Sequence, residues 1–435
     1  SGATTNLASG PTRGGYTINE AYAELEIPLL ADKPFARELT LDLASRYSDF
    51  NTFGDTTNNK IGLKWKPFTS LLVRATANDG FRAPTIADLY GGQSQTFSSF
   101  TDPCDTNFGS SATNSTTRAN CVAAMGAAAN TFRQLQQGFV PAGAPNTQTP
   151  VAFLSGSNPT LQPERSKSQT IGFVWSPEFL TGFNVAMDWW KIRIVDTIVG
   201  DTPTTILNDC YVQGIASRCS STLFTRDATL GYVNFMQFGS RNAGFRKVEG
   251  FDLDVSYRWK TDFGNFSVTS NSTYTSRDYL VSTNDPRIPL SSVGFTSSFR
   301  IRSNLNVGWE YGNWGVSWMA RYYSPMKEGC TYFIAGVTDP NLECNEILYS
   351  PTGLLPGQGT TSQITRRRVV GANTFHDLQV RWSAPWDATI SVGANNVGEH
   401  YGPVMYTQPS ANVSYYGGFD IGRFYYLKYT QKFSL

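Results

Sequence analysis

Hydrophobic and polar residues alternate along many segments of this chain, and residues 251–259 show the alternation without interruption. In an extended strand, successive side chains point to opposite faces. One face of this segment therefore carries only apolar and aromatic residues, namely Phe251, Leu253, Val255, Tyr257 and Trp259. A strand that packs on both faces would be apolar throughout. The pattern predicts one apolar and one aqueous environment, as in a half-buried sheet or the wall of a membrane barrel.

The same two-residue period recurs from residues 23–29 to residues 425–433, in about thirteen segments. The connections alternate in length, because every second one is short and most of the others are long. The long connections span about 82–163, 200–230 and 324–373. Barrels of the outer membrane have short periplasmic turns and longer outer loops. We therefore predict an all-β fold, an antiparallel transmembrane β-barrel with long extracellular loops.

Tryptophans support the membrane interpretation. Seven of the ten lie within a few residues of the predicted short turns: Trp65, Trp175, Trp259, Trp309, Trp314, Trp382 and Trp386. Indole rings favour a membrane interface, where the ring is half apolar and the N–H stays hydrated. In a soluble β-sandwich, the alternative, they would occupy the middle of strands. The placement favours an aromatic girdle at one bilayer surface.

One segment changes phase. After Trp189 the apolar residues move to the opposite parity, at Trp190, Ile192 and Ile194. An extra residue in one strand produces such a shift, so we predict a β-bulge near the two tryptophans.

Composition removes several classes of function. The 435 residues suffice for two or three soluble domains or for one large β-structure. Aromatic residues make up 14% and charged residues only 16%, which suits strands that partly face lipid. The net charge of +1 gives no global field to attract nucleic acid.

No apolar run reaches the roughly 18 residues of a spanning helix. Residues 1–15 lack a signal peptide, so we expect the chain to begin downstream of any targeting sequence.

Six cysteines fall into three pairs that are close in sequence, each in a polar, Gly-rich and Pro-rich stretch: Cys104 and Cys121, Cys210 and Cys219, Cys330 and Cys344. Spacing alone does not fix the connectivity. Local pairing is the simplest interpretation and implies an oxidising compartment. Metal ligation, the alternative, lacks CxxC spacing and has only His376 and His400 to add. We predict disulfides and no metal or cofactor.

The odd number of strands indicates an incomplete wall. The first and last strands both run toward the short turns, as the ends of an odd-numbered antiparallel sheet must. Single-chain bacterial barrels, by contrast, close with even numbers of strands. An open sheet in lipid leaves unpaired backbone groups along both edges, and each costs several kcal/mol. We expect another polypeptide segment, most simply the N-terminal part of the same protein, to supply the remaining strands.

Two motifs resemble a known family. Residues 78–84, Asn-Asp-Gly-Phe-Arg-Ala-Pro, and 158–166, Asn-Pro-Thr-Leu-Gln-Pro-Glu-Arg-Ser, resemble the segments that flank a long outer loop in TonB-dependent outer-membrane receptors. The resemblance covers nearly the whole chain but only the barrel part of such receptors. It implies a barrel of about 22 strands, with about nine strands and a folded plug upstream of this chain. It also implies TonB and its inner-membrane energising complex as partners.

Charged residues give three further candidates. Arg82 and Glu164 stand at the two feet of the longest loop, and we expect them to pair inside the lumen; solvated charges at a rim are the alternative. Arg366 to Arg368 would contact lipopolysaccharide phosphates or an anionic ligand, or form a solvated loop base. Asp252 and Asp254 are interpreted as lumen lining rather than a metal pair.

Aromatic residues cluster in the longest loop. Tyr90, Phe97 and Phe100, with Phe108, are suited to stacking on a ligand ring, although packing against Cys104 and Cys121 would also explain them. The sequence contains no GxSxG, P-loop or HExxH motif, and its two histidines offer little acid–base chemistry. We do not expect an enzyme.

The favoured hypothesis is therefore a TonB-dependent receptor in the bacterial outer membrane that imports a small, scarce solute. The chain would provide barrel wall and ligand-binding loops, surrounded by lipopolysaccharide and outer-membrane lipid. A passive porin and a surface protein for adhesion or structure are the alternatives. The solute stays open between siderophore, cobalamin, sugar and peptide.

Overall fold

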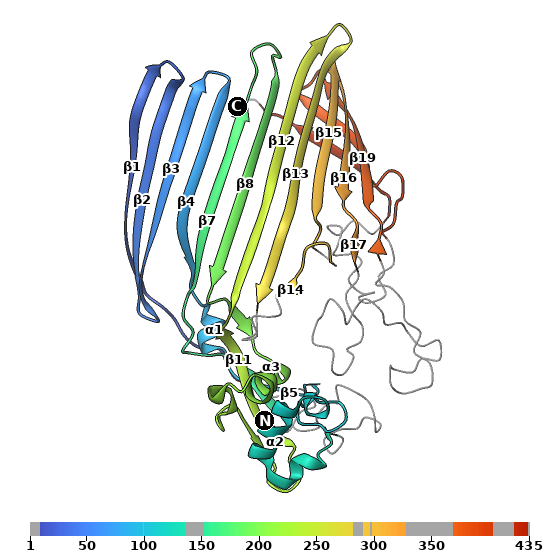
Figure 1. Cartoon of the computed structure of the whole chain (residues 1–435). Helices are drawn as coiled ribbons and strands as arrows, with labels where there is room; N and C mark the ends of the chain where they lie inside the picture. The colour runs from blue at the N-terminus through green and yellow to red at the C-terminus, as the bar shows by residue number, and fades with distance from the viewer. Residues whose placement is uncertain are drawn as a thin grey trace.

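A long antiparallel sheet dominates the computed structural model, which describes residues 9–98, 100–134, 152–281, 290–295, 298–327, 369–402 and 422–433. Each strand pairs with the next along the path, and the sheet forms a curved wall (Figure 1). Its thirteen strands are β1 (Ile18–Lys33), β2 (Ala36–Phe50), β3 (Gly54–Phe68), β4 (Leu71–Arg82), β7 (Glu164–Trp175), β8 (Phe183–Val195), β12 (Phe245–Thr261), β13 (Gly264–Val281), β15 (Ile301–Tyr311), β16 (Trp314–Tyr323), β19 (Asn373–Ala384), β20 (Ala388–Asn395) and β21 (Phe424–Gln431). The predicted all-β class, antiparallel order and strand number are confirmed.

The wall is not closed. Among the described residues, β1 pairs only with β2, and β21 pairs only with β20. The backbone groups on the outer side of both edge strands therefore have no partner strand in this sheet. This matches the expectation of an incomplete wall.

The two faces of the wall differ as the alternation predicts. Phe251 stands opposite Trp189 on β8 and Tyr274 on β13, so aromatic and apolar side chains form rows across strands. We call this side the apolar face. On the other side, the polar face, Asp252 accepts a hydrogen bond from the Thr273 hydroxyl at 2.7 Å. The period of two thus separates the environments.

The predicted lining residues Asp252 and Asp254 bond to side chains of the neighbouring strand. Besides the contact between Asp252 and Thr273, the Asn271 amide donates to Asp254 at 2.5 Å. Within the described residues, no group of three or more His, Cys, Asp and Glu side chains is placed to hold a metal ion. In the same part of the chain, no helix is long and apolar enough to cross a membrane.

Six short connections gather at one end of the strands, which we call the turn end, at the top of Figure 1, whereas the short connection 51–53 between β2 and β3 lies at the opposite end. All seven predicted girdle tryptophans lie at or near strand ends there. The Trp65 Nε1 atom donates to the carbonyl oxygen of Phe35 at 2.9 Å, and Trp309 Nε1 donates to that of Phe263 at 2.8 Å. These two indole N–H groups thus bond to backbone carbonyl groups of the turns.

The predicted bulge near Trp189 and Trp190 is wrong. β8 stays in register with β7 and with β12 through both tryptophans. A register shift does occur nearby, but between β12 and β13, where Ser276 is the extra residue beside Glu249. The change of phase in the sequence of β8 has another cause. Beyond Trp189, the positions on the apolar face are occupied by the basic residues Lys191 and Arg193, so the apolar residues that remain are those on the other face.

The other strands and helices lie mainly in two connections at the opposite end, the loop end. Between β4 and β7 they are α1 (Ile86–Tyr90), β5 (Ser94–Thr96), η1 (Ser110–Ala112), α2 (Ser115–Met125), η2 (Gly126–Asn130) and β6 (Phe153–Gly156). Between β8 and β12 they are β9 (Ile198–Gly200), α3 (Pro203–Leu207), η4 (Asn208–Val212), η5 (Ala216–Cys219), β10 (Phe224–Arg226) and β11 (Val233–Asn242). Short strands β14 (Leu290–Ser291), β17 (Met326–Lys327) and β18 (Val369–Val370) complete the described elements.

Candidate functional site

Two long connections fold together into one body at the loop end, which we call the loop unit (Figure 1). It comprises the described residues of 83–163 and 196–244. Strand β11, from the second connection, runs parallel to β6 of the first. It also pairs with β9 and β10, and β6 pairs with β5. A small sheet therefore links segments that the sequence treats as separate loops.

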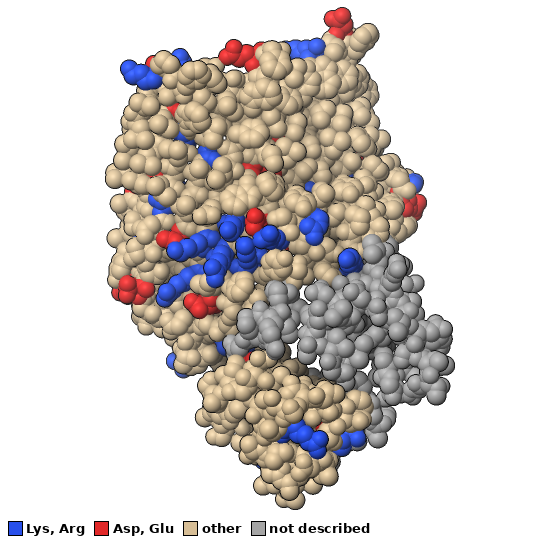
Figure 2. Space-filling view, viewed as in Figure 1, with Lys and Arg blue, Asp and Glu red and all other residues tan. Residues whose placement is uncertain are grey.

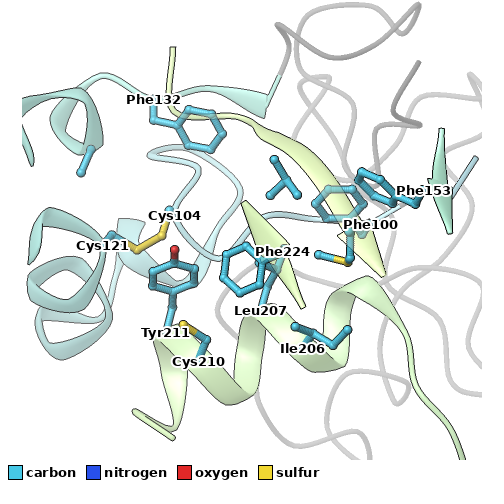
Figure 3. Close-up of a cluster of buried hydrophobic side chains, with 13 residues drawn as sticks. Phe100, Cys104, Cys121, Phe132, Phe153, Ile206, Leu207, Cys210, Tyr211 and Phe224 are labelled. Carbon is cyan, nitrogen blue, oxygen red and sulfur yellow. A yellow bond between two sulfur atoms is a disulfide. The ribbon is translucent and has the colours of Figure 1, made fainter. Parts of the chain in front are cut away.

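The loop unit has a hydrophobic core of its own (Figure 3). Both connections contribute buried side chains to it: Phe100, Cys104, Cys121, Ala129, Phe132 and Phe153 from the first, and Ile206, Leu207, Cys210, Tyr211, Phe224, Val233 and Met236 from the second. A shared core of this kind fixes the position of one long connection relative to the other. Two separate solvated loops would have no such fixed arrangement.

Two of the three predicted disulfides lie in the loop unit and are confirmed, with Cys219 alone of their four cysteines exposed outside the core. Cys104 pairs with Cys121, and Cys210 pairs with Cys219, one bridge in each connection. Each bridge closes a short segment, which limits the unfolded conformations of the chain there. Cys330 and Cys344 lie outside the described residues, and so do Arg366 to Arg368.

A buried ion pair joins the two connections. Arg226 donates to both carboxylate oxygens of Asp102, from Nη1 at 2.7 Å and from Nη2 at 3.0 Å, and its Nε donates to the Tyr211 hydroxyl at 2.9 Å. The side chain of Asp102 is fully buried and that of Arg226 is 9% exposed. Burial lowers the pKa of Arg226, but the Asp102 carboxylate outweighs it and raises that pKa above its ordinary value.

A second charged cluster lies within the second connection. Arg218 donates to Asp201 at 2.5 Å and to Asp209 at 3.0 Å, and Arg241 lies 3.3 Å from Asp201. Burial raises the pKa of Asp209, although the guanidinium groups of Arg218 and Arg241 lower it. The cluster ties η4 and η5 to β11.

Arg82 and Glu164 meet where the loop unit joins the wall. They are register partners on β4 and β7, and Arg82 Nε and Nη2 each donate to a different Glu164 oxygen at 2.8 Å. The backbone N–H of Ile198 donates to the same carboxylate at 2.7 Å. Glu164 therefore connects two wall strands to the start of the second connection.

The Arg82 and Glu164 pair should couple energetically by about 1 kcal/mol, because it is bidentate and the Glu164 side chain is only 11% exposed, although Arg82 is half exposed. A double-mutant cycle with Arg82→Ala and Glu164→Ala, read as free energy of unfolding in detergent micelles, measures this coupling. The pair Arg37 and Asp32, 3.6 Å apart and largely exposed, is the control and should show no coupling. Coupling of equal size in both cycles would contradict the prediction.

The aromatic candidates separate by burial. Phe100 is fully buried in the loop-unit core, so it packs from within and presents no surface to a ligand. Phe97 is 38% exposed. Tyr90 ends α1 and is half-buried, with its ring so close to Gly14 that an added Cβ would lie 2.2 Å from Cδ2. Phe108 lies under the Arg133 guanidinium, 5.4 Å from its ring centre.

Sequence reasoning missed the Asp102 and Arg226 pair. The two residues are 124 positions apart and belong to connections that were predicted as independent loops. No spacing rule relates them. The available signal was weak, namely an unusual number of aromatic residues in two loops that would otherwise be solvated.

A curved antiparallel wall with one apolar and one hydrogen-bonded face, and long folded connections at one end, is typical of a membrane β-barrel. The family model described as "TonB dependent receptor-like, beta-barrel" matches residues 1–397, and the chain belongs to this family. The family consists of outer-membrane receptors and not of enzymes. The predicted family is thereby confirmed. No curated protein sequence is significantly similar to this chain.

Solved structures agree on the fold. The siderophore receptor PirA from Acinetobacter baumannii is 15% identical, with a TM-score of 0.57 over 95% of this chain and 45% of that one. A mutant of the ferric enterobactin receptor PfeA from Pseudomonas aeruginosa is 13% identical, with a TM-score of 0.57 over 96% and 45%. The FrpB iron transporter from Neisseria meningitidis is 14% identical, with a TM-score of 0.51 over 98% and 46%. The chain thus spans less than half the length of these receptors.

Proposed function

We propose that this chain provides part of the wall and the ligand-facing loops of a receptor that imports a scarce solute across the bacterial outer membrane. TonB, coupled to its inner-membrane complex, would supply the energy. The loop unit is the observation that supports this most directly. Two connections share a core and stand at the end of a wall whose polar face would line a lumen, as a solute receptor requires.

The proposed ligand-facing residues lie in the wall and in the loop unit, where Arg82 ends β4, Tyr90 ends α1 and Phe97 follows β5. Arg82 offers a half-exposed guanidinium held by Glu164, and Tyr90 and Phe97 offer partly exposed rings. A cation held in place by a carboxylate suits an anionic ligand, and partly exposed rings suit an aromatic one. Phe100 acts indirectly, because it supports the shape of the loop unit from its core.

A further segment of the same receptor would complete the transport path. The open edges at β1 and β21 require partner strands in lipid, and the similar receptors are more than twice as long as this chain. We propose that the N-terminal part supplies about nine strands and a plug that moves when TonB pulls.

Uptake measurements test the proposal. The similar structures are named as siderophore, ferric enterobactin and iron proteins, so ferric siderophores are the first solutes to test, followed by cobalamin, sugars and peptides. We expect the full receptor to restore uptake of one radiolabelled solute to a receptor-deletion strain, and to lose it in cells without TonB. Uptake that does not need TonB, with ion conductance in a planar bilayer, would instead indicate a passive porin. A receptor with neither activity would favour a surface adhesion or structural role.

A matched pair of variants tests the ligand-facing end. Phe97→Ser should raise the KM of uptake roughly fivefold, the equivalent of about 1 kcal/mol for one aromatic contact. Phe179→Ser removes an exposed phenylalanine at the turn end and should leave the KM unchanged. Equal effects of the two variants would place the ligand elsewhere.

A further inference from the structure

Six basic side chains form a group on the apolar face of the wall, which we call the basic belt. They come from four adjacent strands and are Arg165, Lys167, Lys191, Arg193, Lys247 and Arg277. Figure 2 shows basic side chains gathered over these strands near the loop end. Since alternate positions share a face, the belt lies on the side that carries the tryptophan and phenylalanine rows.

The register places the belt directly beyond the apolar side chains. Ile171, Trp189 and Phe251 form one row across β7, β8 and β12. Two residues further toward the loop end, Lys191 stands in the next row. In the row after that, Lys167, Arg193 and Lys247 stand side by side. The face therefore changes from apolar to cationic within one step of the strand period.

In the register, carboxylates stand opposite three belt cations: Asp79 opposite Lys167, and Glu249 opposite Lys191 and Arg277. These neighbours do not approach to ion-pair distance, unlike the arginines and aspartates of the polar face. There, Arg74 pairs with Asp188 at 2.5 Å, and Arg246 pairs with Asp278 at 2.8 Å. In the part of the chain that the structure describes, no belt cation forms an ion pair; Arg193 stacks on the Phe245 ring, 5.6 Å from its centre.

On the four strands of the belt, the six cations share the apolar face with one carboxylate, Glu249. The neighbouring strands carry Asp79 on β4, Asp55 on β3 and Asp49 on β2 on the same face. Like charges directly opposite one another on neighbouring strands are destabilising. Lys167, Arg193 and Lys247 stand in this relation along one row, which Asp79 continues on the other side of Lys167. An external anion bound over this row would relieve the repulsion.

Two hollows on the apolar face, separated by the row of Gln169 and Lys191, give the belt the shape of an amphiphile site. One hollow of about 550 Å³ is lined by Asp79, Arg165, Lys167 and Arg193, together with Thr57. The other, of about 380 Å³, lies nearer the turn end and is lined by apolar side chains: Leu71, Val73, Ile171, Phe173, Met187, Trp189 and Phe251. Both lie over β4, β7 and β8, with the cationic hollow toward the loop end.

We propose that the basic belt binds the phosphates of lipid A in lipopolysaccharide, with the acyl chains along the apolar hollow. Guanidinium and ammonium groups bind phosphate strongly, and hydrocarbon chains suit an apolar trough at membrane depth. The proposal rests on the proposed function in one respect, namely that the receptor is oriented in the membrane with its loop end at the outer leaflet. This site differs from Arg366 to Arg368, where the sequence suggested lipopolysaccharide contact.

Native mass spectrometry of the purified full receptor tests the belt. Titration with bis-phosphorylated lipid A in detergent should give a bound lipid, and the variant Arg165→Gln, Lys167→Gln, Arg193→Gln should weaken its affinity by about tenfold or more. Dephosphorylated lipid A should bind the unaltered receptor as weakly as the phosphorylated lipid binds the variant.

The control variant removes three exposed lysines at the turn end, by Lys33→Gln, Lys260→Gln and Lys432→Gln, and should retain the lipid. Unchanged affinity in the belt variant, equal loss in the control variant, or equal binding of dephosphorylated lipid A to the unaltered receptor would each overturn the proposal. Because no transport is measured, failure of the uptake experiment and failure of this one are distinguishable.

Discussion

Residues 1–435, produced alone, should not form a stable closed barrel in membranes. β1 spans Ile18–Lys33 and β21 spans Phe424–Gln431, and each has one edge without a partner strand among the described residues. About five unpaired backbone groups on each edge at membrane depth, at several kcal/mol each, sum to tens of kcal/mol. Few proteins have more than about 15 kcal/mol of stability to set against this. We expect aggregation or protease-sensitive material.

Denaturing electrophoresis with mass spectrometry measures the outcome. The chain preceded by the upstream part of its receptor should migrate as a compact, heat-modifiable, protease-resistant species, whereas the chain by itself should not. A sample that contains only this 47.9-kDa chain and behaves as a closed barrel would refute the prediction.

Replacing Asp102 by alanine should destabilise the loop unit by roughly 3 to 5 kcal/mol, because it leaves the Arg226 guanidinium buried without a counter-ion. Hydrogen exchange read by mass spectrometry should show faster exchange in residues 100–134 and 203–244. The wall strands, whose hydrogen bonds do not depend on this pair, should keep their protection.

The double variant Asp102→Ala with Arg226→Met removes both charges and serves as the control. It should recover part of the lost protection, since an apolar side chain in place of the guanidinium leaves no unpaired buried charge. Exchange in Asp102→Ala at the rate of the unaltered protein would contradict the prediction, as would a double variant less stable than the sum of the two single changes.

Patterns that depend on near neighbours in the sequence predicted much of the fold. The alternation from Phe251 to Trp259 predicted which side chains share a face, because the pleat of a strand fixes this without reference to distant residues. Turn chemistry located the short connections for the same reason. The Cys104–Cys121 and Cys210–Cys219 pairs followed from closeness along the chain.

Patterns that depend on position relative to the membrane were harder to interpret. The change of phase after Trp189 was predicted as a bulge, but β8 continues in register and its apolar-face positions become Lys191 and Arg193. A single strand does not show whether an apolar residue has moved to another face or whether the surroundings have changed. Neighbouring strands in register decide between these cases.

The sequence by itself determined the wall: the strands, their order, their two faces and the family. Only the tertiary structure decided that two long connections share a core, that Asp102 reaches Arg226 across 124 residues, and that basic side chains from four strands gather in one belt. The reason is physical. Strand alternation is imposed by the geometry of adjacent residues, whereas packing between distant segments depends on how the whole sheet curves and brings them together.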